Sequence, residues 1–331
     1  SIARRGGGFV TTAGESITTG QLYLEDVSPT AGTRVETAED ELRRVTAHHL
    51  ERMTARGGGW RGVETSWLEE SRVLRIHVHV DVRDAMGANI VNTVMESLRE
   101  PVERLTGGRV VMAILTNTAD RRLTTSRFTV PVSRLARGGV DGAEAARRIT
   151  VAARIAREDH TRAVTHNKGI MNGITAVALA TGNDTRALEA AVHEYASRGG
   201  YYRALTRFEV RNDELHGEIT LPLPLGTIGG AAGIHPTTRA SLELMGRPGT
   251  IELAGILASV GLAQNFAALF ALVTEGIQRG HMGLHANRVA WAAGARGEER
   301  LPVVQSMREA GRFTAEYARE ALTRVRESRL P

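Results

Sequence analysis

The alternation of apolar and polar side chains along the chain predicts a mixture of strands and helices. In residues 74–82 every second position is apolar, which is the two-residue repeat of a strand that buries one face. Residues 36–56 and 142–157 instead space their apolar side chains as an α-helix does. Similar patterns predict further strands at 21–27, 109–115, 127–132, 204–210 and 216–222, and further helices at 90–105, 185–197 and from 302 onward.

The order of these elements predicts an α+β fold with more than one domain. Over the first hundred-odd residues, strands are mixed with two helices, which is typical of a small α+β unit. Residues 1–15 contain three consecutive glycines and are predicted to be a linker or the end of a lost element. A length of 331 residues suggests about two domains, each with its own core.

One apolar segment is long enough to cross a membrane. Residues 253–273 carry no charged side chain over 21 positions, which meets the length criterion for a membrane span. However, Gln264 and Asn265 lie next to each other within the segment, and paired amides are costly in the middle of a bilayer. We therefore predict a buried core helix and no membrane partner.

Composition narrows the functional classes. The formal net charge is only +5, so the sequence pI of about 10.1 reflects the use of arginine in place of lysine, and a nucleic-acid partner is not expected. There is no cysteine, which excludes disulfides, thiolate metal sites and a cysteine nucleophile. The chain shows no signal peptide, and its first residue is Ser1 rather than Met.

The candidate chemistry lies in residues 166–173. Among 42 Lys+Arg residues, lysine occurs once, at Lys168. A primary amine can approach a small oxygen closely and pass a proton, whereas the wide, planar guanidinium of arginine keeps its proton. We therefore predict that Lys168 stabilises a developing oxyanion or acts as an acid. The flanking Gly169 and Gly173 predict a turn, and a chance lysine on a surface turn is the alternative.

Three residues near Lys168 in sequence suit a supporting role. Arg162 has the geometry to clamp a carboxylate in bidentate fashion, with a solvated arginine as the alternative. Asn172 lies four residues after the lysine and either orients the amine or serves only as a turn residue. Asp184 stands directly before a predicted helix, where it makes a good N-cap. Its other interpretation is a carboxylate that keeps the lysine protonated.

Two further patterns mark candidate binding residues. His281 and His285 have the four-residue spacing of some zinc sites, but no glutamate follows the first histidine and there is no obvious third ligand, so no metal is expected. A histidine that transfers a proton fits better, and a packed or surface histidine is the alternative. The segment from Asp84 to Asn89 joins a strand to a helix through Gly87, which suits phosphate binding, although an ordinary turn is the alternative.

Six motifs follow one another along the chain. They are Asp81-Val82-Arg83-Asp84-Ala85-Met86-Gly87-Ala88-Asn89, the spacing of residues 162–173, Ala180-Thr181-Gly182-Asn183-Asp184, the glycine-rich residues 226–236, Gly261-Leu262-Ala263-Gln264-Asn265 and Glu275-Gly276-Ile277-Gln278-Arg279-Gly280-His281-Met282. With these motifs the chain resembles the bacterial (class II) 3-hydroxy-3-methylglutaryl-coenzyme A (HMG-CoA) reductases. The resemblance covers essentially all 331 residues.

The resemblance implies an oxidoreductase of isoprenoid metabolism. Enzymes of this family reduce HMG-CoA to mevalonate and free coenzyme A with two nicotinamide cofactors in succession, either NADH or NADPH. It further implies that Lys168 stabilises the thioester and aldehyde oxygens, that Asp184 supports the lysine, and that His281 protonates the departing thiolate. It also implies a homodimer or larger homo-oligomer with the active site at the subunit interface, no metal, and a cytoplasmic location.

The resemblance implies the remaining site residues and the domains as well. The substrate-side residues would be Arg162, Asn172, Asn117 and Gln264, and the dinucleotide loop would hold Asp84, Met86, Gly87 and Asn89. The implied domains are a remnant of the large domain and linker at 1–15, an inserted ferredoxin-like, non-Rossmann cofactor domain at 16–116, a large mixed α/β HMG-CoA-binding domain at 117–274 and a helical C-terminal flap at 275–331.

Three questions stay open at the level of sequence. The family's catalytic glutamate belongs to a Glu-Pro-Ser segment, and nothing in residues 1–10 matches it, so we expect an N-terminally truncated chain that lacks this group. A non-catalytic module that binds coenzyme A or a dinucleotide is therefore the alternative function. Glu51 could bind the ribose 2′-hydroxyl of NADH, and Arg52 or Arg56 the 2′-phosphate of NADPH. The choice between the two cofactors therefore stays open. Whether the cell uses the reaction to make mevalonate or to consume it also stays open.

Overall fold

The computed structural model describes residues 2–230 and 234–328, without the side chains of residues 4, 5 and 277–284. The chain divides into two compact units. The first consists of Ser1–Pro131 and Thr150–Phe266, and the second of Val132–Ile149 and Ala267–Pro331. Helices α6 (Gly142–Glu158) and α11 (Thr250–Val273) each have residues in both units.

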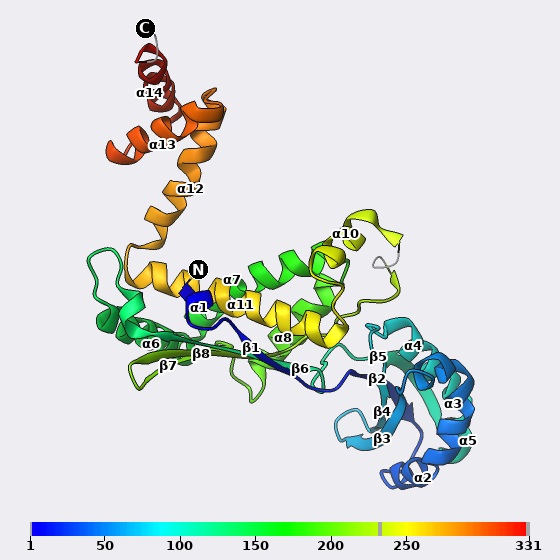
Figure 1. The fold of residues 1–331 in the computed structure, drawn as a ribbon. Coiled ribbons are helices and arrows are strands. Elements are labelled where there is room, and N and C mark those ends of the chain that lie inside the picture. Colours follow the sequence, from blue (N-terminus) through cyan, green and yellow to red (C-terminus); the bar gives the residue numbers. More distant parts are fainter. Residues whose placement is uncertain (1, 231–233, 329–331) are drawn as a thin grey trace. The chain divides into compact units, whose positions relative to one another are not determined.

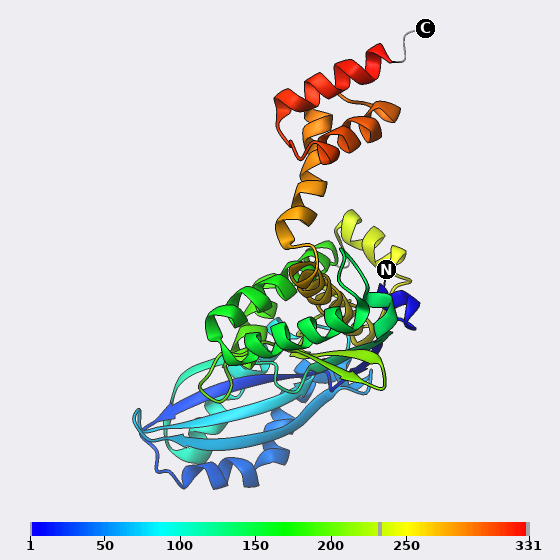
Figure 2. The same ribbon diagram turned by 90° about the vertical axis from the view of Figure 1, so that its left-hand side faces the viewer.

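The first unit contains two four-stranded antiparallel sheets. One of them has the strand order β1-β6-β8-β7. These strands are β1 (Val10–Ala13), β6 (Leu123–Pro131), β8 (Glu214–Pro222) and β7 (Thr206–Arg211). Helices α7 (His160–Ala180), α8 (Thr185–Ser197) and the first part of α11 pack against this sheet (Figures 1 and 2).

Aromatic side chains fill the space between this sheet and α11. The ring of Phe128 on β6 lies 6.2 Å from that of Phe208 on β7 and 4.9 Å from that of Phe266 on α11, measured between centroids. Gly217 of β8 leaves room for these rings, because a Cβ there would lie 2.5 Å from Phe128. This packing fixes α11, and the helices beside it, on the sheet.

The second sheet has the strand order β3-β4-β2-β5 and follows a strand–helix–strand–strand–helix–strand sequence. Its strands are β2 (Ile17–Glu25), β3 (Gly59–Leu68), β4 (Val73–Asp81) and β5 (Arg109–Leu115). The helices between them are α2 (Ala31–Thr37), α3 (Glu39–Thr54), α4 (Ala88–Ser97) and α5 (Arg99–Thr106). The apolar positions of residues 74–82 are at most 1% exposed and pack into one core with these helices.

Shorter elements complete the chain. The first unit also holds α1 (Ile2–Arg5) and α10 (Pro236–Leu244). The second unit holds the 3-10 turns η1 (Val132–Leu135) and η2 (Gly297–Glu299) and the helices α12 (Ile277–Ala292), α13 (Arg300–Glu309) and α14 (Ala315–Glu327). Buried Ala290, Val303, Met307 and Ala318 belong to the core of the last three helices.

The structure confirms the α+β class and most of the predicted elements. The strands predicted at 74–82 and 109–115 are β4 and β5, and the helices predicted at 142–157 and 185–197 are α6 and α8. The strands at 21–27, 127–132, 204–210 and 216–222 are present with shifted ends, as β2, β6, β7 and β8.

Some predicted elements are wrong in ways that have physical causes. Residues 10–13 are not linker but an edge strand, in which Val10 pairs with Arg127 of β6. Strand β3 was not predicted, because a bulge between Trp60 and Gly62 breaks the two-residue repeat. The helix predicted at 90–105 is two helices, which meet at Leu98, shortly before Pro101; proline has no N–H to continue the hydrogen-bond ladder. The helix predicted from 302 onward is likewise divided, into α13 and α14, whereas the helix predicted at 36–56 is present with shifted ends as α3.

Helix α11 is the apolar segment that resembles a membrane span. Among the described residues it is the one helix long and apolar enough to cross a membrane, with a mean hydropathy of 1.9 and 44% of that window buried in the protein. Two of its polar side chains are bonded within the first unit: Ser259 lies 3.0 Å from Ser126 of β6, and Asn265 accepts from Thr206 of β7 at 2.9 Å. These bonds are what the prediction of a core helix requires.

Candidate active site

Lys168 lies near the middle of the long helix α7, so the predicted turn is wrong. Both flanking glycines are helical, and one has a packing role. A Cβ on Gly173 would lie 3.0 Å from Val260 and 3.3 Å from Gln264, both on α11. On the opposing helix, a Cβ on Gly261 would lie 2.8 Å from Ile174. Glycine on each side therefore lets α7 and α11 approach closely, which positions the lysine-bearing helix.

The exposed face of α7 lines a cleft of about 340 Å³ that it shares with α8. Lys168 and Asn172 both line the cleft one helical turn apart, as their spacing predicts. The other lining residues are Met171, Thr175, Ala176 and Leu179 of α7 and Glu189 and His193 of α8. Within the described part of the chain, Lys168 makes no ion pair or hydrogen bond, so its ammonium group is available to a ligand.

A chain of hydrogen bonds that the sequence did not reveal borders this cleft. Glu189 accepts from the hydroxyl of Thr175 at 2.9 Å, and its other carboxylate oxygen lies 2.9 Å from Nε2 of His193. The Nδ1 of His193 lies 2.8 Å from the hydroxyl of Tyr202. The four-residue spacing of Glu189 and His193 on a predicted helix was the available signal, but nothing in the sequence placed that helix beside Lys168.

Asp184 is the N-cap of α8, which is one of the two roles predicted for it. Its Oδ1 accepts from the backbone N–H groups of Arg186 at 2.9 Å and Ala187 at 3.2 Å. The Nε of Arg186 also lies 3.6 Å from this oxygen. Among the described residues Asp184 and Lys168 form no ion pair, so a role of the carboxylate toward the lysine stays a prediction.

Arg162 and His166 lie one turn apart on another side of α7. His166 is 2% exposed, and its Nε2 lies 2.6 Å from the hydroxyl of Thr206, which itself donates to Asn265. Because a hydroxyl has one proton to donate, Nε2 is the donor, and Nδ1 is a buried acceptor without a partner in the described part of the protein. Burial, together with the charge of Arg162, lowers the pKa of His166 to about 3, so this ring is neutral at pH 7.

The remaining predicted substrate-side and catalytic residues are spread over several elements. Gln264 is exposed on α11, and its Cβ adjoins Gly173 of the lysine-bearing helix. Asn117 is exposed just after β5 and does not line the Lys168 cleft. The backbone of His281 belongs to α12 in the second unit, and its side chain lies outside the described residues. Where side chains are described, no three His, Asp or Glu groups gather as a metal would require.

The predicted dinucleotide loop is held by its backbone. The carbonyl of Met86 accepts from the hydroxyl of Thr18, and the carbonyl of Asp84 accepts from the N–H of Thr227 at 2.8 Å. Gly87 has a φ of +94°, and a Cβ there would lie 2.5 Å from Val82, so the bend requires glycine. Helix α4 starts directly after it, with exposed Asn89 in its first turn, where backbone N–H groups favour an anion.

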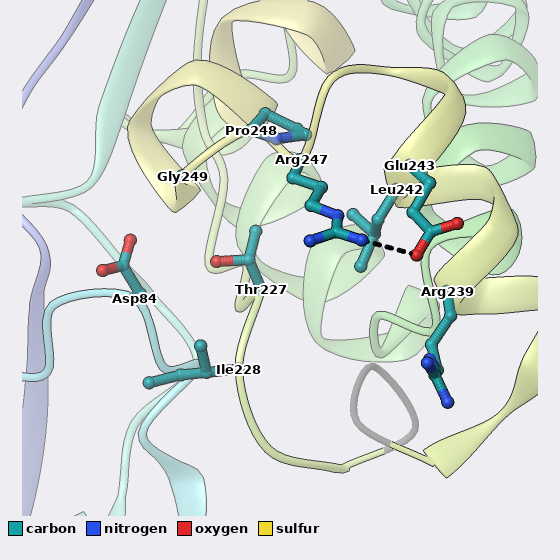
Figure 3. A pocket seen from close by; sticks show the side chains of 9 residues that line it. All are labelled: Asp84, Thr227, Ile228, Arg239, Leu242, Glu243, Arg247, Pro248 and Gly249. Carbon is teal, nitrogen blue, oxygen red and sulfur yellow. Dashed lines mark hydrogen bonds and ion pairs between the residues drawn. The ribbon is translucent and has the colours of Figure 1, made fainter.

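Asp84 also borders a pocket of about 450 Å³ that has both charged and apolar side chains in its lining (Figure 3). The other lining residues are Thr227, Ile228, Arg239, Leu242, Glu243, Arg247, Pro248 and Gly249. The Oδ1 of Asp84 accepts from the N–H of Thr250 at the start of α11, at 3.0 Å, and Arg247 pairs with Glu243 at 2.9 Å. The two guanidinium groups of this pocket, at Arg239 and Arg247, suit phosphate or carboxylate oxygens.

Comparison with known proteins gives a consistent set of matches. Residues 1–286 match the protein-family model described as hydroxymethylglutaryl-coenzyme A reductase. The chain is 42% identical over 335 residues to the 3-hydroxy-3-methylglutaryl-coenzyme A reductase of Archaeoglobus fulgidus, covering 98% of this chain and 74% of that protein. It is 39% identical over 276 residues to the probable enzyme of the same name in Borreliella burgdorferi, covering 83% of this chain and 64% of that protein.

A solved structure is similar along almost the whole chain. It is that of the class II 3-hydroxy-3-methylglutaryl-CoA reductase from Streptococcus pneumoniae, bound to NADPH in open conformations. The TM-score is 0.80 at 40% sequence identity, and the match covers 98% of this chain and 80% of the other.

Proposed function

This chain belongs to the family of hydroxymethylglutaryl-coenzyme A reductases, and from that premise we propose which of its residues carry the reaction. The activity of the family is the NAD(P)H-dependent reduction of HMG-CoA to mevalonate and coenzyme A. The observation that carries the assignment of residues is the position of Lys168. The only lysine of the chain lies unpaired, within the described residues, on the wall of a cleft with Asn172 one turn away.

Lys168 is the proposed group that stabilises negative charge on the substrate oxygen. When hydride reaches the thioester carbonyl, and later the aldehyde, charge develops on that oxygen. A nearby ammonium group without another counter-ion stabilises this charge without first breaking an ion pair. The position of Lys168 in a helix supports this role, because a helix locked by close packing holds its side chains more precisely than a surface turn does.

Asp184 and His281 are the other two proposed catalytic residues. Asp184 would keep the amine of Lys168 protonated by its negative charge, in addition to capping α8. His281 would donate a proton to the departing coenzyme A thiolate, which suits a group that titrates near neutral pH. Both roles rest on the resemblance in the motifs around residues 180–184 and 275–282.

Arg162, Asn172, Asn117 and Gln264 are proposed to bind the substrate. Asn172 has the strongest support, because it lines the same cleft as Lys168. Gln264 is supported by the contact of α11 with α7 at Gly173. Arg162 is half-buried and makes no ion pair among the described residues, so its guanidinium is available to a substrate carboxylate.

The residues from 16 to 116 are proposed to form the inserted cofactor domain. Support comes from the second sheet, whose strand order is that of a ferredoxin-like rather than a Rossmann fold. Asp84, Met86, Gly87 and Asn89 would form the dinucleotide loop, with a phosphate at the start of α4. The relative from Streptococcus pneumoniae binds NADPH, and we propose NADPH or NADH as the cofactor here, with no metal.

The proposed assembly is a homodimer or larger homo-oligomer in the cytoplasm, with each active site at a subunit interface. In the proposed division of the chain, residues 1–15 belong with the large domain at 117–274, and the pairing of β1 with β6 supports this. Residues 275–331 would form a C-terminal flap, and the separate core of α12, α13 and α14 supports their treatment as one body.

The proposal is tested by the oxidation of NADPH and NADH, followed at 340 nm, in the presence and absence of HMG-CoA. The protein used is the one the organism makes, so that every residue of the natural enzyme is present. We expect oxidation that depends on HMG-CoA and yields mevalonate. Binding of a dinucleotide without any HMG-CoA-dependent oxidation would instead identify a non-catalytic binding module.

A further inference from the structure

Arg122 is a buried arginine that the proposed reaction does not use. It lies directly before β6 and is 4% exposed. Its Nη1 donates to the carbonyl of Met86 at 3.1 Å and to the hydroxyl of Thr18 at 3.4 Å. Its Nη2 donates to the carbonyl of Leu225 at 2.7 Å. One side chain therefore joins the proposed dinucleotide loop, strand β2 of the small sheet and the segment that follows β8.

The surroundings of Arg122 are unusual for a buried charge. Among the described residues it has no carboxylate partner, and its guanidinium donates to carbonyl and hydroxyl oxygens. Burial lowers the pKa of Arg122 to about 10, and the nearby charge of Asp81 opposes this shift, so the group stays charged at neutral pH. A buried cation needs every one of its hydrogen bonds, so it holds its acceptors at fixed positions.

The same two segments meet again next to Arg122. A Cβ on Gly226 would lie 2.6 Å from the backbone nitrogen of Met86, so the segments touch backbone to backbone. The N–H of Gly226 donates to Oδ1 of Asn183 at 2.8 Å, and Asn183 directly precedes Asp184. Contacts therefore run from the dinucleotide loop through Arg122 and Leu225 to the residue next to a proposed catalytic carboxylate.

We propose that Arg122 is a positioning residue, which fixes the loop from Asp84 to Gly87 relative to the segment before α8 and so sets where a bound cofactor lies. This inference rests on the proposed function for the identity of the loop. Without the guanidinium, the carbonyl groups of Met86 and Leu225 lose a charged donor, and the loop keeps only its uncharged hydrogen bonds from Thr18 and Thr227. Cofactor binding should weaken more than HMG-CoA binding, because the loop is proposed to bind the cofactor and does not line the cleft of Lys168.

The test measures the binding of both ligands to an Arg122→Met variant, which keeps the length of the side chain and removes its donors. NADPH binding is followed by the change in nicotinamide fluorescence, and HMG-CoA binding by calorimetry. We expect the Kd for NADPH to rise by about tenfold or more, as for loss of charged hydrogen bonds, with the Kd for HMG-CoA within about twofold of the unchanged protein. Arg122→Lys, which keeps the charge, should give an intermediate Kd. Arg127→Met is the matched control, because this arginine is exposed on the neighbouring strand β6 and pairs only with Glu218 in the described structure.

A second variant covers the case in which Arg122→Met does not fold. Gly226→Ala leaves Arg122 in place but pushes against the backbone of Met86, so it should weaken NADPH binding with the same selectivity. The inference is overturned if either folded variant binds NADPH as the unchanged protein does, if both ligands are lost equally, or if the unchanged protein binds no nicotinamide cofactor. An unchanged protein that binds NADPH but does not oxidise it with HMG-CoA contradicts the proposed function alone, and the selective effect would still support the positioning role.

Discussion

At the scale of single residues, the choice of lysine at position 168 can be explained by what surrounds it. The side chain is exposed in a cleft and has no counter-ion among the described residues, so nothing in the fold requires a cation there. A surface cation would serve as well if it were arginine, which the chain uses everywhere else. We therefore propose that the chemistry of the cleft is the reason for an amine at this position.

Asp184 offers a way to separate a structural from a chemical role. Asn caps a helix about as well as Asp does, so Asp184→Asn should keep the cap of α8 and change the free energy of unfolding by no more than about 0.5 kcal/mol. The same change removes the negative charge proposed to support Lys168, so turnover should fall by about tenfold or more. Denaturant unfolding and steady-state turnover measure the two effects. Turnover equal to that of the unchanged protein would show that Asp184 is a cap and nothing more.

His166 predicts how stability depends on pH. Its pKa is about 3 in the folded protein, lowered from 6.5. As the pH falls below 6.5, His166 becomes protonated in the unfolded chain but stays neutral in the folded protein until about pH 3. The free energy of unfolding therefore decreases as the pH falls from 6.5 to 3. Between pH 7.5 and pH 5 this one group should remove about 2 kcal/mol.

The check is a pair of urea titrations, at pH 7.5 and pH 5, of the unchanged protein and of His166→Gln. Glutamine keeps a donor for Thr206 but does not titrate, so the variant should lose about 2 kcal/mol less stability between the two pH values. His235→Gln, at an exposed histidine, is the control and should behave like the unchanged protein. An identical pH dependence in His166→Gln would contradict the assignment.

At the scale of elements, the sequence predicted what depends on periodicity and missed what depends on tertiary packing. Strand β4 and helix α8 were predicted almost to the residue, because a two-residue repeat and an N-cap are local signals. The prediction of a turn at Lys168 was wrong because glycine occurs both in turns and where two helices pack closely. Only the position of α11 shows that Gly173 has the second use.

This packing makes a prediction with an internal control. Gly261→Ala should lower the free energy of unfolding by about 1–2 kcal/mol, because the new methyl group meets the fully buried Ile174 at 2.8 Å. Gly169→Ala should instead raise it, by up to about 1 kcal/mol, because a Cβ there meets nothing within 4 Å and alanine is the better helix former. Denaturant unfolding of both variants gives the comparison. Equal effects of the two substitutions would contradict the close approach of α7 and α11.

At the scale of the whole molecule, the α+β class and the membership in a family of reductases were accessible from sequence, because motifs such as residues 81–89 and 180–184 keep their order along the chain. The contacts that hold these motifs together could not be predicted from the sequence. Nothing in the sequence distinguishes Arg122 from the many other arginines. Its proposed role depends on three segments that are distant in sequence. The hydrogen bonds of Glu189, His193 and Tyr202 likewise depend on how α8 lies along α7.

The most direct test of the central claim is the turnover of HMG-CoA by the protein with Lys168→Arg, measured beside the unchanged protein. The assay counts NADPH or NADH oxidised and mevalonate formed. The unchanged protein should oxidise two cofactors for each mevalonate, and the variant, which keeps the charge but not the amine, should lose turnover by at least about 100-fold, as for loss of an oxyanion donor, while its thermal unfolding is unchanged. Turnover of the folded variant at the rate of the unchanged protein would contradict the claim that the amine of Lys168 carries the chemistry.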